Sequence, residues 1–69
     1  MTIFIVSRGE RCEGSSVLAA FASKSEAFAF ARTVLDGETV EREPRGDTVL
    51  LLTGAFGVDF VAVRELPVR

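Results

Sequence analysis

The segment Ser23–Gly37, SKSEAFAFARTVLDG, contains the clearest local signal in the chain. It opens with S-x-x-E, a capping box in which the Ser23 and Glu26 side chains each accept a hydrogen bond from a free backbone N–H at a helix start. Spacing residues 100° apart gathers the apolar side chains on one stripe: Ala27, Phe28, Phe30, Ala31, Val34 and Leu35. Gly37 can adopt the left-handed conformation that ends a helix. The sequence therefore predicts one amphipathic helix from Lys24 to about Leu35.

Strands are predicted on both sides of this helix. Thr2–Ser7 and Val17–Phe21 precede it, and both are apolar runs too short for a stable helix. After it, Glu38–Glu43 alternates charges around one valine, as an exposed edge strand does, while Thr48–Thr53 and Val58–Leu66 are apolar strands separated by turn residues. The expected fold is α+β: a single small domain over residues 1–69 with the order ββαβββ. We expect a mostly antiparallel sheet with the helix on one face.

The stretch Arg8–Ser16, RGERCEGSS, has two glycines with the spacing of a phosphate-binding loop. Such a loop needs a lysine directly after its second glycine, and it leads into a helix. Ser15 stands at the lysine position here, and a strand is expected next. We therefore expect a hairpin loop, with Gly9 and Gly14 free to take positive φ, and no phosphate site.

Composition argues against catalysis. The chain has no histidine, which removes the commonest metal ligand and the usual general base near neutral pH. Its one cysteine, Cys12, cannot form an internal disulfide, and its carboxylate neighbours Glu10 and Glu13 favour an unreactive thiol. We expect no catalytic residue, no cofactor and no metal, and hence no enzyme.

Charge and hydropathy restrict the partners. The net charge is −2 and the chain has no block of basic residues, so we expect no direct contact with nucleic acid. No apolar run approaches the roughly 20 residues that cross a bilayer, and no secretory signal is evident. The expected location is the cytoplasm, with no membrane contact.

Most of the expected strands are apolar on both faces, although the single helix can cover only one. Two explanations stay open. The sheet curls over itself, with arginine stems lying across the remainder, or a second chain, identical or not, packs there. If Phe4 and Val6 lie opposite the helix, they belong to that contact surface.

The first half of the chain resembles a family of very small phage and bacterial proteins of uncharacterised function. In that family a ββ hairpin with the segment E-G-x-x-V-L-G/A-x-F precedes a helix that opens S-x-x-E-A. The resemblance covers Ile3–Ala31 and rests on Glu13-Gly14, Val17-Leu18, Phe21 and Ser23–Ala27. Arg11-Cys12 stands where an aromatic residue is commoner. The resemblance implies a ββα-type fold and a phage-like setting, and it transfers no catalytic residue.

We therefore expect a noncatalytic, phage-type binding protein. Proteins of this kind often block host machinery. By analogy, the specific function we expect is that of an anti-CRISPR inhibitor, which blocks a host CRISPR surveillance complex by protein–protein contact. The expected partner-binding residues are the acidic Glu38, Glu41, Glu43, Asp47, Glu10 and Glu13, facing an Arg/Lys-lined groove, together with Phe4 and Val6. The alternative is a homodimeric structural or regulatory accessory protein that uses the uncovered sheet face.

Overall fold

The computed structural model describes residues 1–10, 14–35 and 37–68. Within them the chain forms five strands and one helix. They are β1 (Thr2–Glu10), β2 (Gly14–Phe21), α1 (Lys24–Val34), β3 (Thr39–Arg42), β4 (Thr48–Gly54) and β5 (Asp59–Pro67). The predicted α+β class and the order ββαβββ are confirmed.

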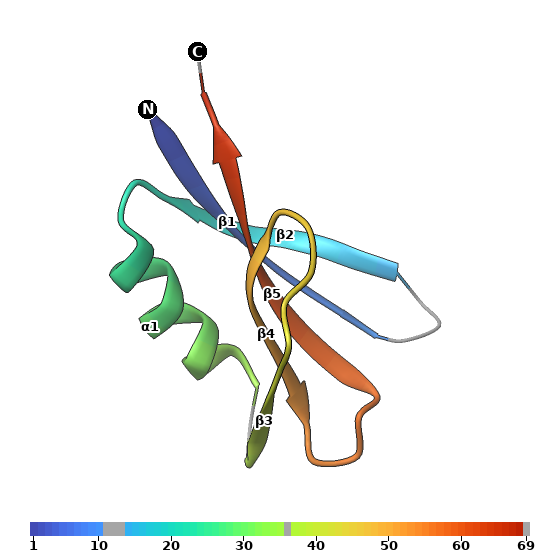
Figure 1. Ribbon diagram of the computed structural model, residues 1–69. Helices are drawn as coiled ribbons and strands as arrows, with labels where there is room; N and C mark the ends of the chain where they lie inside the picture. Colours follow the sequence, from blue (N-terminus) through green and yellow to red (C-terminus); the bar gives the residue numbers. More distant parts are fainter. Residues whose placement is uncertain (11–13, 36, 69) are drawn as a thin grey trace.

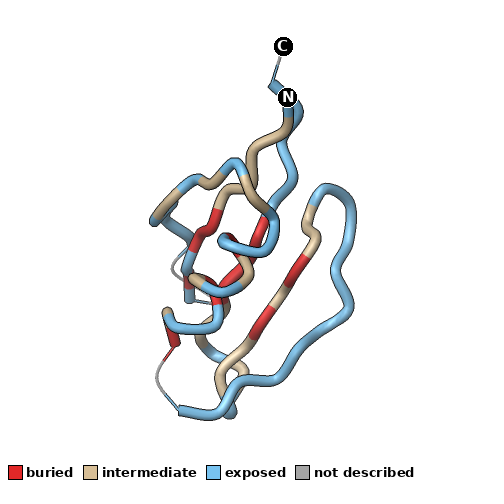
Figure 2. Tube along the Cα trace, turned by 90° about the vertical axis from the view of Figure 1, so that its left-hand side faces the viewer, coloured by how far each residue is buried: buried red, intermediate tan, exposed pale blue. Residues whose placement is uncertain are grey.

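All strands join one antiparallel sheet in the order β2-β1-β5-β4-β3. The last strand along the chain, β5, therefore lies in the middle, where it pairs with both β1 and β4. The start of β1 and the end of β5 lie together at the top of Figure 1, where the Val68 N–H donates to the Met1 carbonyl at 2.7 Å. The two edges are β2 and β3, and β3 with the loop after it is exposed throughout (Figure 2).

Helix α1 begins and ends close to the predicted residues. Ser23 is the N-cap, and its hydroxyl accepts a hydrogen bond from the Glu26 N–H at 3.5 Å. The Glu26 carboxylate makes no hydrogen bond with the described residues, so only the serine half of the predicted capping box forms. The helix ends at Val34, because Leu35 is already extended, and Gly37 takes the predicted left-handed conformation with φ +83°.

The predicted apolar stripe of α1 packs on the sheet, with its smallest residues at the centre. Ala27 and Ala31 are almost completely buried, so the helix backbone approaches the sheet closely. Beneath them lie buried side chains of the three central strands, β1, β4 and β5: Val6, Leu50, Leu52, Val61 and Val63.

The two larger aromatic residues of the stripe lie at its margins and are half-buried. The Phe30 ring meets the Phe21 ring of β2 at a centroid distance of 5.4 Å. The Phe28 ring lies between two cations of the same helix, with Lys24 Nζ at 5.4 Å and the Arg32 guanidinium at 5.7 Å from its centroid. The core is therefore aliphatic, and the aromatic side chains close its rim.

The condition on which Phe4 and Val6 would belong to a contact surface, that they lie opposite the helix, is not met. Val6 is fully buried in the core with the helix alanines, and Phe4 packs against the same core, opposite Phe21 in the β1–β2 register. Because β1 is apolar on both faces, its alternation leaves open which face meets the helix. The opposite face of β1 carries Ile3 and Ile5.

The expected hairpin loop at residues 8–16 is mostly strand. The β1–β2 ladder continues through the pairs Arg8–Ser16, Gly9–Ser15 and Glu10–Gly14, and Gly14 has the expected positive φ. Cys12 and Glu13, which belong to the expected loop, lie outside the described residues. The strands extend further than their apolar runs because polar residues can pair in a ladder as well as apolar ones do.

Gly9 has a different role from the expected one. It is buried in β1, and a Cβ atom there would lie 2.4 Å from the Gly14 carbonyl oxygen and 2.7 Å from Cζ of Phe60. Gly9 is thus required for close approach by the Phe60 ring rather than for a turn.

Candidate functional site

The sheet face opposite α1, here called the open face, is partly covered by its own side chains. The strand registers place Val17, Ser7, Ala62 and Leu51 in one row across this face. Ser7 and Ala62 form its low centre and are only 8% and 9% exposed, because larger neighbours flank them. Beside this row the Phe60 ring covers Gly9. Neighbouring side chains of the sheet itself therefore shield the centre of the open face.

The exposed large apolar residues lie at the periphery of the molecule instead. They fall at the chain ends (Met1, Leu66, Val68), on β2 (Val17, Leu18), on β3 (Val40) and on the β4–β5 turn (Phe56, Val58). Exposed apolar groups that gather at one place are typical of contact surfaces. The β4–β5 turn and β2 each carry two of them, and at the chain ends Met1 and Val68 are joined by a backbone hydrogen bond.

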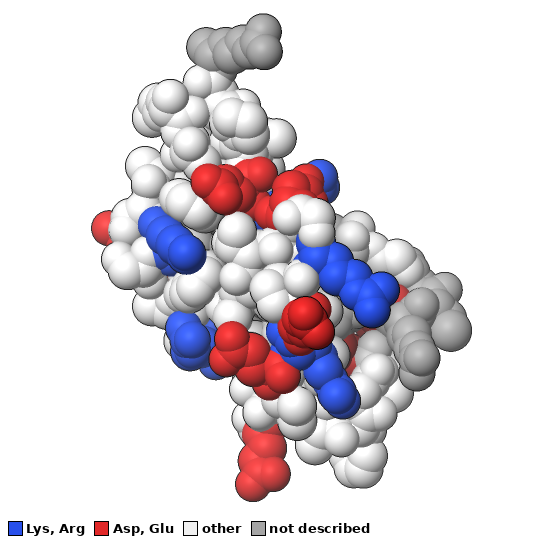
Figure 3. All heavy atoms as spheres, viewed as in Figure 1, with Lys and Arg blue, Asp and Glu red and all other residues white. Residues whose placement is uncertain are grey.

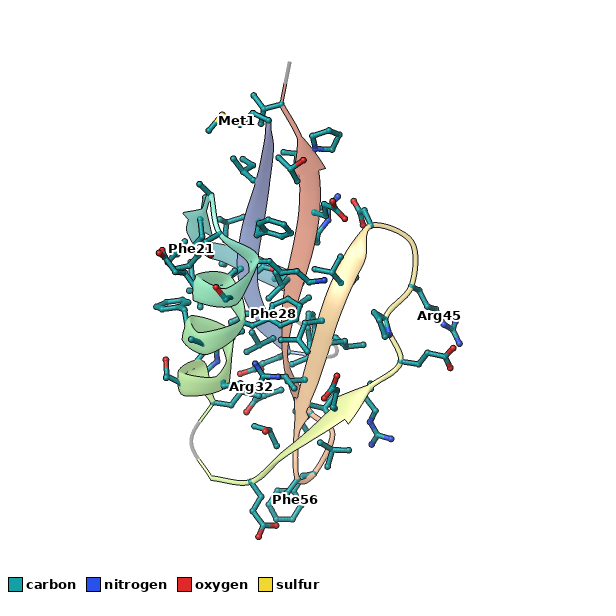
Figure 4. The ribbon with its side chains drawn as sticks, turned by 60° about the vertical axis from the view of Figure 1, so that its left-hand side comes forward. Met1, Phe21, Phe28, Arg32, Arg45 and Phe56 are labelled. Atoms are coloured by element: carbon teal, nitrogen blue, oxygen red, sulfur yellow. The ribbon has the colours of Figure 1, made fainter. Side chains whose placement is uncertain are left out.

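The β4–β5 turn presents the most exposed aromatic side chain of the described residues. The Gly57 N–H donates to the Gly54 carbonyl at 2.9 Å and closes the turn, and Gly57 has φ +72°. Phe56, between these glycines, is 95% exposed. In Figure 4 it lies on the turn at the lower end of the molecule, away from the helix.

Two acidic residues line a hollow beside this aromatic side chain. A surface hollow of about 440 Å³ beside the turn is lined by Gly37, Glu38, Gly54, Ala55, Phe56, Val58 and Asp59. Asp59 also lies directly opposite Glu10 in the β1–β5 register. We call Phe56, Val58, Glu38, Asp59 and Glu10 the tip surface.

Sequence reasoning missed Phe56 and Asp59 and found Glu38 and Glu10 for another reason. The sequence pattern predicts only a turn at Gly54–Gly57. The sequence feature that could have identified Phe56 is a large aromatic residue between two turn glycines, because a side chain at the end of a turn seldom reaches the core.

The predicted acidic edge is only partly formed. Glu38, Glu41 and Glu43 are exposed along β3 and its flanks. Asp47, however, pairs with Arg64 of β5, whose Nη2 and Nε donate to one carboxylate oxygen at 2.7 and 3.1 Å. These hydrogen bonds lower the pKa of Asp47 and raise the pKa of Arg64. Asp47 thus ties the β3–β4 loop to β5 and is not a free acidic group.

Basic residues interrupt the rest of this edge. The Nε of Arg42 donates to Thr53 Oγ1 at 3.4 Å, and a second hollow of about 470 Å³ is lined by Arg42, Glu43, Arg45, Thr48 and Leu51. Figure 3 shows acidic and basic side chains interspersed over this side of the molecule, and Arg45 extends outward from its loop in Figure 4. The structure therefore separates the predicted acids: Glu38 and Glu10 join the tip surface, while Glu41 and Glu43 alternate with arginines.

In the part of the chain that the structure describes, no three His, Cys, Asp or Glu side chains converge on a place that could hold a metal ion. No helix among the described residues is long and apolar enough to span a membrane. Comparison of the chain with protein-family models, with curated proteins and with solved structures found no match.

Proposed function

We propose that this protein is a noncatalytic protein-binding module that contacts its partner through the tip surface. The observation that carries the proposal is the 95% exposure of Phe56 at the end of a hydrogen-bonded turn. Burying such a side chain is worth about 1.5–3 kcal/mol relative to leaving it in water. Aromatic residues are enriched in the buried centres of protein interfaces, where a few anchors supply most of the affinity.

The support beneath Phe56 favours this role. Both strands that lead into the turn are anchored in the core, β4 through Leu52 and β5 through Val61. The hydrogen bond between Gly57 and Gly54 holds the turn itself. A backbone turn that is already formed loses less conformational entropy on association, so more of the burial free energy of its side chain appears as affinity.

The charges of the tip surface specify the chemistry of the partner. Glu38 and Asp59 line one hollow with Phe56, and Glu10 lies across from Asp59. Like charges opposite one another destabilise a sheet, and cations of a partner would relieve that repulsion. The partner that fits is an apolar pocket bordered by Arg or Lys. A basic nucleic-acid groove of a CRISPR surveillance complex has charges of this sign, and inhibition of such a complex is the narrower form of the proposal.

A matched pair of truncations tests the proposal. Phe56→Ala removes the anchor, whereas Leu66→Ala removes an exposed apolar side chain from the opposite end of β5. We expect Phe56→Ala to weaken binding about 30-fold or more, as loss of a hot-spot residue does, and Leu66→Ala to change it little. The measurement is biolayer interferometry against the partner recovered by cross-linking in a bacterial lysate, or against a purified surveillance complex.

Phage plating in a CRISPR-active host tests the narrower form. Wild-type protein is expected to restore plating and Phe56→Ala to abolish that effect at equal expression. Binding that depends on Phe56 without any restoration of plating would retain the binding module and reject the CRISPR target. Equal binding by Phe56→Ala and wild type would reject the tip surface as the contact site.

A further inference from the structure

Strand β2 forms one edge of the sheet along its whole length. It is eight residues long, and β1 is its single neighbour among the described strands. In an antiparallel ladder alternate residues direct their backbone N–H and C=O groups away from the neighbouring strand. The outer side of β2 therefore offers a row of donors and acceptors to another strand.

The two edges of the sheet differ in how they resist such pairing. Strand β3 has four residues, includes Glu41 and Arg42, and leads into Glu43-Pro44, and charges and proline on an edge discourage strand addition. Residues Gly14–Ala22 include neither a charged residue nor a proline. In the middle of β2, Val17 is 68% and Leu18 46% exposed. The β2 edge thus lacks these common protections and carries exposed apolar side chains as well.

We propose that a second copy of this chain pairs with β2, antiparallel across a two-fold axis, so that two sheets become one continuous sheet. In such a pairing identical strands supply each other with donors and acceptors, and residues near the axis meet their own counterparts. A charged residue there would meet its like. Because the chain carries a net charge of −2 and β2 carries no charged residue, two copies can approach along this strand without placing like charges opposite each other.

The β1–β2 register is compatible with a two-fold axis beside Leu18, near the middle of β2. Val6 pairs with Ala19 and Ser7 with Val17, so Leu18 is an extra residue at a β-bulge. The bulge reverses the alternation, and Val17 and Ala20 both lie on the open face although they are three residues apart.

Strands related by a two-fold axis need opposing side chains on the same face. An axis beside Leu18 meets this requirement. Val17 then lies opposite Ala20 of the second copy, both on the open face, and Ser16 lies opposite Phe21 of the second copy, both on the helix side.

A charge on each edge tests the proposal with a matched control. Val17→Lys places a cation in the middle of β2, opposite Ala20 of the second copy, whereas Val40→Lys places one at an exposed valine of β3. Sedimentation is measured at protein concentrations up to about 1 mM, which detects dimers with a Kd as weak as about 1 mM. The apparent mass of wild type and of Val40→Lys should rise from 7.4 kDa toward twice that value. Val17→Lys should stay monomeric, and circular dichroism should show both variants folded.

Two further measurements locate the contact. In a Cys12→Ser background, Leu18→Cys should cross-link to a second copy on mild oxidation, whereas Val40→Cys, nearly equal to it in exposure at 42%, should not. Amide exchange should slow with rising protein concentration at alternate residues of β2 and nowhere along β3.

Several outcomes would overturn the proposal: wild type that stays monomeric at about 1 mM, a dimer that survives Val17→Lys, or slowed exchange confined to another strand. Slowed exchange of β2 only after another protein is added would assign the edge to that protein instead. The result is independent of the tip surface, because Val17→Lys should leave binding through Phe56 intact.

Discussion

At the scale of single residues, Gly9 and Gly54 differ in their surroundings, and we expect substitution by alanine to have opposite effects on stability at the two positions. At Gly9 a Cβ atom would lie within 3 Å of the Gly14 carbonyl oxygen, the Phe60 ring and the Ser15 side chain, while at Gly54 nothing lies within 4 Å. Gly9→Ala should destabilise the protein by about 1–3 kcal/mol, as overpacking does. Gly54→Ala should be neutral or stabilise it by up to about 1 kcal/mol, because φ there is not positive.

Thermal melts of the two glycine variants beside wild type measure this difference. Phe60→Leu should recover part of the loss in Gly9→Ala, since it removes one of the clashing groups and leaves the carbonyl oxygen. Equal melting temperatures for Gly9→Ala and wild type would mean that the Phe60 ring does not lie on Gly9.

The sequence alone identifies the glycines but does not show which one is needed for positive φ and which for close approach of another side chain. It assigned both Gly9 and Gly14 to a loop, because a local pattern shows the freedom of a glycine and not what approaches it. Gly14 does have positive φ, but the reason for Gly9 is a phenylalanine from the far end of the chain. Phe56 and Val6 illustrate the same limit: one apolar residue is almost fully exposed and the other fully buried.

At the scale of elements, the close packing of α1 makes its small residues sensitive to size. Ala31 is buried at the centre of the helix–sheet contact, whereas Ala29 faces solvent on the same helix. Ala31→Leu should cost about 1–3 kcal/mol through overpacking, which lowers the melting temperature by roughly 4–8 °C per kcal/mol for a domain of this size. Ala29→Leu has the same change in helix propensity and should be nearly neutral. Equal melts would show that the helix can move away from the sheet at little cost.

The elements themselves were largely predictable from the sequence. Ser23, the apolar stripe and Gly37 define α1 to within one residue, and the charged alternation around Val40 correctly predicts an edge strand. Those signals are local, because caps, turns and periodicity act over a few residues. Which residue of the stripe lies deepest is set by the sheet, and it is Ala27 or Ala31 rather than Phe30.

At the scale of the whole molecule, the placement of charge predicts how a basic partner would associate. Glu38→Lys with Glu10→Lys changes the tip surface, and Glu26→Lys with Glu65→Lys makes the same change in charge elsewhere. Each substitution adds two units, so both variants go from −2 to +2. Electrostatic steering changes association rates by about 10- to 1,000-fold.

We therefore expect the first pair to slow association at least about tenfold more than the second, and the difference to shrink in high salt. Stopped-flow or interferometric rates across salt concentrations measure it. If the two pairs of substitutions slow association equally, the net charge of the protein and not the tip surface determines the association rate.

Overall topology was the part of the fold that sequence patterns left undetermined. Five strands can be ordered in many ways, and only long-range contacts place β5 between β1 and β4. The same holds for the candidate site, since Glu10, Glu38 and Asp59 come from three separate segments that the sheet brings to one end.

The central position of β5 also has a consequence for synthesis on the ribosome. Until Asp59–Pro67 has emerged, the β1–β2 hairpin and the β3–β4 hairpin share no backbone hydrogen bonds, because β5 alone joins them. Val61 and Val63, both fully buried, are absent from the core until then. Until β5 has emerged, a growing chain therefore exposes the apolar side chains of both hairpin segments and of the helix stripe. The complete sheet can therefore form only after β5 has left the exit tunnel, and its rate of formation depends on distant rather than neighbouring contacts.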